Sequence, residues 1–147
     1  MKKRFFMALA FFAANATAGI HVEQSKVRLL PPGVPNTSAY MKIENTGDSE
    51  RILIGANSPA VKRVEIHNNV MKNGVMKMQK QERLVLKQGE VFELRPGGYH
   101  LMLFGVKSPL KAGQAVPMTL VFQNGEKITV NANVSADIGK QHHHHHH

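Results

Sequence analysis

The sequence contains no cysteine and no tryptophan, and aromatic residues make up only 6% of its 147 residues. The absence of cysteine excludes a disulfide scaffold, a cysteine nucleophile, zinc–thiolate sites and iron–sulfur clusters. It also excludes a blue-copper electron-transfer site, whose defining ligand is a cysteine thiolate. Any metal chemistry of this chain must therefore use other side chains.

Both ends of the chain are predicted to lie outside the mature protein. Residues 2–4 are positively charged, residues 5–14 are apolar, and Ala16-Thr17-Ala18 forms an A-x-A cleavage site. This apolar run is far shorter than the roughly 20 residues of a membrane-spanning helix, so residues 1–18 are predicted to be a cleaved signal peptide. Residues 142–147 are six consecutive histidines and are interpreted as an expression tag.

The remaining segment, Gly19 to Gln141, has the length of one domain, with its core expected over about residues 22–134. It carries 16 Lys and Arg against 10 Asp and Glu, a formal charge of +6, and three histidines. No membrane span is expected, and we expect a monomer. Six methionines remain, and four of them fall within residues 71–102.

Short alternating apolar runs separated by turn residues about every ten positions predict a single all-β domain, a sandwich or barrel. No stretch keeps an apolar period of 3.6 over ten residues, so no substantial helix is expected. Two Asn-Gly pairs, at residues 73–74 and 124–125, predict tight type I′ hairpin turns. The expected strands are residues 22–29, 38–45, 51–56, 61–68, 75–78, 84–86, 91–94, 100–105, 118–123 and 128–134.

Histidine and methionine share strand faces in this pattern. Side chains two residues apart point the same way along a strand, so His100 and Met102 share one face while Leu101 and Leu103 take the core face. His67 likewise shares a face with Glu65 and Arg63. Met76 and Met78 form a further same-face pair.

Imidazole and thioether together form a soft ligand set that suits Cu(I) and suits Zn, Mg or Ca poorly. Thioether sulfur also cannot be lost to disulfide formation in an oxidising compartment, as a cysteine ligand can. Taken singly, each residue has an ordinary alternative explanation: methionine fills gaps in cores, and a lone histidine is commonly a hydrogen-bonded structural residue.

The spacing of four of these residues is H-x10-M-x21-H-x-M, formed by His67, Met78, His100 and Met102. With the flanking segments 74–78 and 95–103, it resembles the PCu(A)C family of periplasmic copper chaperones across about residues 22–134. Many members carry Met directly after the first His, where this chain has Asn68.

The resemblance implies that His67, Met78, His100 and Met102 bind one Cu(I) in a cupredoxin-like antiparallel Greek-key β-sandwich or barrel. It implies no enzymatic activity but a periplasmic chaperone that passes copper, by ligand exchange, to a respiratory copper enzyme. The expected recipient is the copper-A centre or another copper site of a terminal oxidase, or another periplasmic cuproenzyme. A periplasmic copper buffer or resistance protein with the same site is the alternative within copper biology.

Met71 and Met76 are not included among the predicted ligands. Met76 is interpreted as a hydrophobic cover over the site. Tyr99 and Phe104 are interpreted as packing residues, and the turn at residues 96–98 as a device that positions His100.

Cleavage after Ala18 would create a second, weak site. The new chain would begin Gly19-Ile20-His21, and its amine, two backbone amides and imidazole form a square-planar nitrogen set suited to Cu(II) or Ni(II). Cleavage after Ala16 would remove this possibility. Otherwise, His21 is a strand residue without a special role.

Other functions are less well supported by the sequence. The basic residues are scattered and lack interleaved aromatics, which argues against nucleic-acid binding. No G-x-S-x-G motif, glycine-rich phosphate loop or carboxylate pair suggests a hydrolase. A structural β-sandwich with incidental His and Met remains open.

Overall fold

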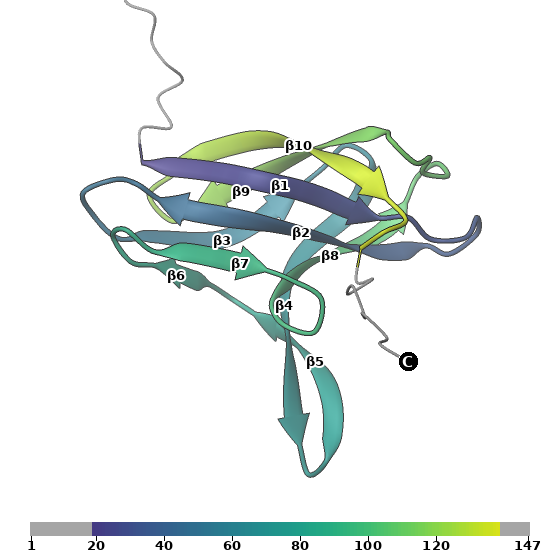
Figure 1. Ribbon diagram of the computed structural model, residues 1–147, viewed down its shortest axis with the longest axis horizontal. Coiled ribbons are helices and arrows are strands. Elements are labelled where there is room, and N and C mark those ends of the chain that lie inside the picture. Colours follow the sequence, from purple (N-terminus) through teal and green to yellow (C-terminus); the bar gives the residue numbers. More distant parts are fainter. Residues whose placement is uncertain (1–18, 139–147) are drawn as a thin grey trace, which may run out of the picture.

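The computed structural model describes residues 19–138, and in this segment every regular element is a β-strand. Figure 1 shows these strands wrapped around a common interior, with one hairpin extending beyond the main body. The strands are β1 (Ile20–Arg28), β2 (Asn36–Asn45), β3 (Arg51–Asn57), β4 (Val61–Lys72), β5 (Val75–Gln81), β6 (Leu84–Leu86), β7 (Val91–Leu94), β8 (His100–Val106), β9 (Ala115–Phe122) and β10 (Lys127–Ser135).

All ten strands predicted from the alternating pattern are present, so the all-β prediction is confirmed. The largest difference is in β4 and β5, which run four and three residues beyond their predicted ends. Those extra residues are largely exposed and polar, with no buried face to signal a strand. They form a hairpin because the two strands pair with each other from Ile66↔Gln81 to Lys72↔Val75.

Seven strands close into a barrel in the order β4-β8-β2-β1-β10-β9-β3. The ring closes where β3 pairs with β4 through Ala56 and Val64. β5 extends the sheet outward from β4, β6 pairs with β3, and β7 pairs with the second half of β2. Within this arrangement β8 lies between β2 and β4 (Figure 1).

One pairing departs from the expected antiparallel arrangement. β1 and β10 run parallel over Lys26↔Asn133 to Arg28↔Ser135. A parallel pair cannot be joined by a tight hairpin, and here the two strands come from opposite ends of the domain. The local sequence pattern specifies strands but does not specify which distant strands become neighbours.

The two Asn-Gly turns have different outcomes. Asn73 and Gly74 both have positive φ angles, 52° and 77°, as the predicted type I′ turn between β4 and β5 requires. The type I′ prediction for Asn124-Gly125 is wrong, because only Gly125 has a positive φ angle. There the Phe122 amide donates to the Glu126 carbonyl and the Gly125 amide to the Phe122 carbonyl, closing a three-residue loop.

Burial of alternate residues inside the barrel determines which side chains point outward. Leu101 and Leu103 on β8 are fully buried, as are Ile66 on β4 and Ala39 on β2, and they belong to one apolar core. Alternation along β8 therefore directs His100 and Met102 to the outside of the barrel, as predicted.

No helix in the described residues is long and apolar enough to cross a membrane. The predicted signal peptide (residues 1–18) and the predicted tag (142–147) lie outside the described residues.

The core position of Leu103 gives a test of this arrangement. Leu103→Ala should lower the free energy of unfolding by about 2–5 kcal/mol, because it removes buried methyl groups and leaves a cavity. Val75→Ala, at an exposed position on β5, should change it by less than about 0.5 kcal/mol. Urea denaturation of the two variants measures both effects, and an equal, small loss would contradict the assignment of Leu103 to the core.

Candidate metal centre

The predicted ligands lie on three adjacent strands, β5, β4 and β8. His67 on β4 is paired directly with His100 on β8. Two residues along β8, Met102 is opposite Glu65 on β4 and Ser38 on β2. Because residues paired across adjacent strands point to the same side of a sheet, these side chains form one continuous patch.

The two histidine rings lie side by side. Their centroids are 5.9 Å apart, with an angle of 44° between the ring planes. Metal–imidazole bonds are about 2 Å long in zinc proteins, and two rings bound to one ion at that distance have centroids about 5–6 Å apart. The spacing of His67 and His100 therefore suits joint ligation of a single ion.

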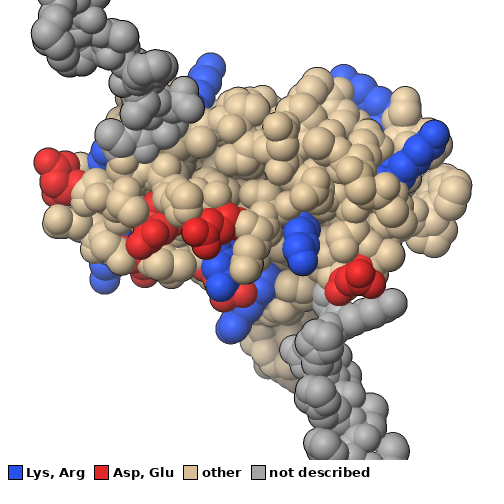
Figure 2. All heavy atoms as spheres, turned by 45° about the horizontal axis from the view of Figure 1, so that its top comes forward, with Lys and Arg blue, Asp and Glu red and all other residues tan. Residues whose placement is uncertain are grey.

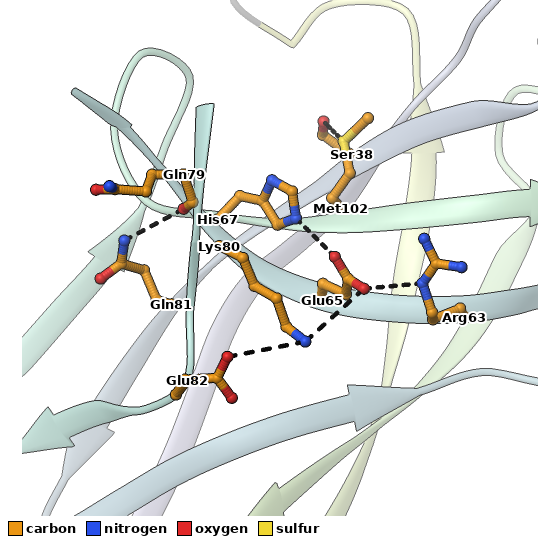
Figure 3. Close-up of polar contacts among 9 residues, drawn as sticks. All are labelled: Ser38, Arg63, Glu65, His67, Gln79, Lys80, Gln81, Glu82 and Met102. Atoms are coloured by element: carbon orange, nitrogen blue, oxygen red, sulfur yellow. Dashed lines mark hydrogen bonds and ion pairs between the residues drawn. The ribbon is translucent and has the colours of Figure 1, made fainter. Parts of the chain in front are cut away.

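His67 is held by one ring nitrogen and has the other available. Its Nε2 donates a hydrogen bond to the Glu65 carboxylate over 3.0 Å, as Figure 3 shows. The carboxylate can only accept, so in the neutral ring this contact places the proton on Nε2 and leaves a lone pair on Nδ1. Nδ1 is buried and has no hydrogen-bond partner among the described residues. A buried nitrogen lone pair without a partner is unfavourable unless a metal ion uses it.

Glu65 links His67 to the surrounding cations. Its other oxygen accepts from the Arg63 guanidinium at 2.8 Å and lies 4.0 Å from the Lys80 ammonium (Figure 3). The His67 hydrogen bond, helped by the positive charges of Arg63 and Lys80, holds the pKa of the Glu65 carboxyl below its usual range. Glu65 is therefore ionised at neutral pH and places a negative charge beside the histidine pair.

His100 is held from the other side by the turn that precedes β8. Pro96 and Gly97 occupy the centre of a turn closed by the Gly98 amide donating to the Arg95 carbonyl, and Gly97 has the positive φ angle, 84°, that this turn requires. The Gly98 carbonyl then accepts from Nδ1 of His100 at 3.0 Å. Nε2 is the nitrogen that remains for a metal ion.

His100 is more enclosed than its position on the outer face suggested. Only 3% of it is exposed, and the Tyr40 ring lies 6.3 Å away, centroid to centroid. This burial lowers the pKa of His100 below its ordinary value. His100 therefore stays neutral, and able to bind a cation, at pH values where an exposed imidazole is protonated.

Met102 lies beside the histidine pair and is half-buried. The Ser38 hydroxyl donates to its sulfur over 3.6 Å, which orients the thioether (Figure 3). Phe104, two residues further along β8, has its ring centroid 5.8 Å from that of His67 and lies under the Arg63 guanidinium. Phe104 thus covers one side of the patch, in line with its predicted packing role.

Met78 is more distant from the other three candidates. It lies on β5 opposite Asn69, on the same face as His67 but displaced along the strand by two residues. Diagonal neighbours of this kind are about 7–8 Å apart, within reach of a long side chain. Met78 is 56% exposed, and Lys80 takes the position directly opposite His67. The structure thus brings His67, His100 and Met102 together and leaves Met78 at their margin.

Two supporting residues were not assigned a role from the sequence. The sequence places Glu65 on the same strand face as His67, and this spacing of two residues is the signal that could have predicted their contact. Ser38 gave no signal, because its contact with Met102 depends on the pairing of β2 with β8. Within residues 19–138, no group of three or more His, Asp or Glu side chains is placed to share a metal ion.

The second predicted site, through His21, meets a structural obstacle. His21 pairs with Glu44 in the β1–β2 ladder, and its Nε2 contacts Glu23 at 2.8 Å. Binding Cu(II) through the amides of Ile20 and His21 would require the start of β1 to leave the sheet. The site also depends on a cleavage point outside the described residues, so it stays a prediction.

Charged side chains do not gather into a single basic surface on the face shown in Figure 2. Lys and Arg are separated there by Asp, Glu and uncharged residues. Such a face offers no continuous track for a nucleic-acid backbone.

The barrel with this patch defines a PCuAC-type domain, and solved structures support that class. The copper-bound PCuAC domain from PmoF2 is 26% identical, has a TM-score of 0.68, and is matched over 80% of this chain and 93% of its own. The Cu(I)-bound DR1885 from Deinococcus radiodurans is 31% identical, with a TM-score of 0.62 and 85% coverage of both chains. The predicted resemblance and the predicted cupredoxin-like fold are confirmed, as is the prediction that the chain is not an enzyme.

The chain belongs to the LpqE-like family, described as putative lipoprotein LpqE-like, whose model matches residues 20–134. Putative lipoprotein Lxx21020 of Leifsonia xyli subsp. xyli is 37% identical over 73% of this chain and 64% of its own length. Uncharacterized protein RP573 of Rickettsia prowazekii is 30% identical over 71% of this chain and 58% of its own. The chain thus spans less than two thirds of the length of each of these relatives.

The lowered pKa of His100 gives a prediction for the copper-free protein. Below about pH 6.5 the unfolded chain binds a proton at this residue that the folded protein resists, so stability falls as the pH drops from 6.5 towards the lowered pKa. His100→Gln should reduce this fall, measured as the difference in urea midpoint between pH 7.5 and pH 5.5. His21→Gln, at an exposed position, is the control. The same pH dependence in the wild type and His100→Gln would contradict the prediction.

Proposed function

We propose that this protein is a periplasmic Cu(I) chaperone in which His67, His100, Met102 and Met78 hold one copper ion. In this proposal copper is cargo that is bound, carried and released. Support for copper as the ion comes from the copper-bound PCuAC domains that the structure resembles.

The arrangement of the histidine pair is the observation that carries the proposal. Each ring has one nitrogen held by an acceptor, the Glu65 carboxylate for His67 and the Gly98 carbonyl for His100. Metal-binding histidines are typically oriented in this way, because the held N–H fixes the tautomer and directs the other nitrogen at the ion. The unpartnered Nδ1 of His67 is what a site prepared for a metal ion would leave.

The donor set favours the reduced ion. Two neutral imidazoles and thioether sulfur stabilise Cu(I), whereas Cu(II) prefers harder ligands in tetragonal geometry. Arg63 and Lys80 lie against the Glu65 carboxylate and balance its charge, so the contribution of Glu65 to the site is to orient His67. Such a site holds copper in a single oxidation state, as suits transport better than electron transfer.

Unequal exposure of the ligands gives a route for release. His100 is 3% exposed and His67 is 13% exposed at its side chain, while Met78 is 56% exposed. A ligand of the recipient can approach from the Met78 side and replace that thioether first, while the histidines still hold the ion. Stepwise ligand exchange of this kind avoids releasing free copper.

The recipient in this proposal is a copper enzyme of the respiratory chain, with the copper-A or another copper site of a terminal oxidase as the first choice. Location in the periplasm rests on the predicted signal peptide. The description of the family as putative lipoproteins agrees with an exported protein.

Removal of a sulfur ligand tests the site. Met102→Leu and Met78→Leu should each weaken Cu(I) binding by roughly a hundredfold or more, because leucine preserves the apolar volume but cannot ligate. The measurement is a competitive Cu(I) titration of residues 19–141 without the histidine tag. Met118→Leu is the matched control, since Met118 is fully buried inside the barrel and should leave the affinity unchanged. Wild-type affinity in both site variants would exclude the assignment.

A deletion strain tests delivery as distinct from storage. Loss of a dedicated chaperone should lower terminal oxidase activity at limiting copper, and added copper should restore it. A copper buffer with the same site would instead leave oxidase activity normal and make the cells copper-sensitive, which would refute delivery while leaving the metal site intact.

A further inference from the structure

The hairpin formed by β4 and β5 extends beyond the barrel and carries three exposed methionines (Figure 1). Met71, Met76 and Met78 are 62%, 54% and 56% exposed. Methionine normally fills interior gaps, so three exposed thioethers on one short hairpin are not explained by packing.

The register places these three side chains on one face. Met71 is directly opposite Met76, and Met78 follows Met76 by two residues on β5. The turn joins Lys72 to Val75 as the hydrogen-bonded pair nearest the loop, so Met71 and Met76 form the next, non-hydrogen-bonded pair. Side chains approach most closely in pairs of that type, about 4.5–5.5 Å between Cβ atoms.

The opposite face of the hairpin has a different chemistry. Val75 pairs there with Lys72, and Val70 with Lys77. Sulfur is therefore confined to one face. This is also the face of His67, because Met71 lies four positions after His67 along β4 and an even step returns to the same face.

We propose that Met71 and Met76 form a second, outer Cu(I) site at the tip of this hairpin, with Met78 as a ligand shared between the outer and inner sites. Two or three thioethers make a soft donor set of the kind that selects Cu(I). Copper binding at the tip is independent of the function proposed above. The further role of the tip, to bind incoming copper before it reaches the inner site, rests on that function.

Distance separates the two sites and gives Met78 its role. Met71 lies four residues from His67 along β4, roughly 13 Å of extended strand. One ion therefore cannot use both sets of ligands at once. Met78 lies between them, next to Met76 along β5 and diagonal to His67 across the hairpin. It is placed to take copper from the tip and pass it to the histidine pair.

The ligands of the two sites set the order of their affinities. The tip offers only exposed thioethers on a hairpin that extends beyond the barrel. The inner site adds two imidazoles whose orientation is fixed, His67 by Glu65 and His100 by the Gly98 carbonyl. Copper is therefore held weakly at the tip and more tightly at the inner site.

The test is a Cu(I) titration, under anaerobic conditions, of tag-free protein (residues 19–141) labelled with carbon-13 at the methionine methyl groups. The wild type should bind two equivalents. The first should shift the methyl signal of Met102, and the second those of Met71 and Met76, while the buried Met118 signal serves as an internal control.

The double variant Met71→Leu/Met76→Leu keeps the apolar surface and removes the sulfur. It should bind one equivalent with unchanged affinity and load that copper more slowly from a weak Cu(I) complex. Val75→Ala, on the opposite face of the hairpin, should behave as the wild type. Binding of two equivalents by the double variant, or unshifted Met71 and Met76 signals in the wild type, would overturn the outer site.

A separate variant distinguishes this proposal from the first. Met102→Leu should weaken the first equivalent and preserve the shifts of Met71 and Met76. If Met102→Leu leaves the first equivalent unaffected, the inner assignment fails while the outer site stands. If the Met71→Leu/Met76→Leu variant binds its one equivalent with unchanged affinity but loads it at the wild-type rate, the tip has no role in receiving incoming copper.

Discussion

The strict alternation of side chains along β8 is the constraint on which the candidate metal centre depends. Leu101 and Leu103 fill the barrel, so His100 and Met102 must point outward, and no shift of register can exchange them without exposing the core. The pairing of β8 with β4 then brings His67 beside His100. Hydrophobic burial on one side of a strand thus sets the spacing of the candidate metal ligands on the other.

Much of the fold was accessible from the sequence because two-residue periodicity and turn residues are local signals. Prediction from the sequence failed where a turn or a strand pairing depended on distant parts of the chain. Asn73-Gly74 and Asn124-Gly125 are the same dipeptide, yet only the first forms the type I′ turn, because the pairing of Phe122 with Glu126 selects a longer loop for the second. The parallel pairing of β1 with β10 likewise has no local signature.

The placement of the candidate ligands was predicted in part. Alternation correctly placed His100 and Met102 on a common outer face, but it could not show that Tyr40 and the turn before β8 enclose His100. The contact of Glu65 with His67 follows from a spacing of two residues and could have been anticipated. The contact between Ser38 and Met102 joins residues far apart in the chain and emerges only from the folded sheet.

The exposed edge of β5 has a consequence for self-association. Among the described strands β5 pairs only with β4, so its outer backbone groups are open to pairing with another chain. Strands with this exposure can stack edge to edge and aggregate, particularly when they are rich in apolar residues. Lys77 lies between the two methionines of β5 and Lys80 follows them, and the like charges of two such edges repel each other. The hairpin can therefore display thioethers to solvent while resisting growth into an intermolecular sheet.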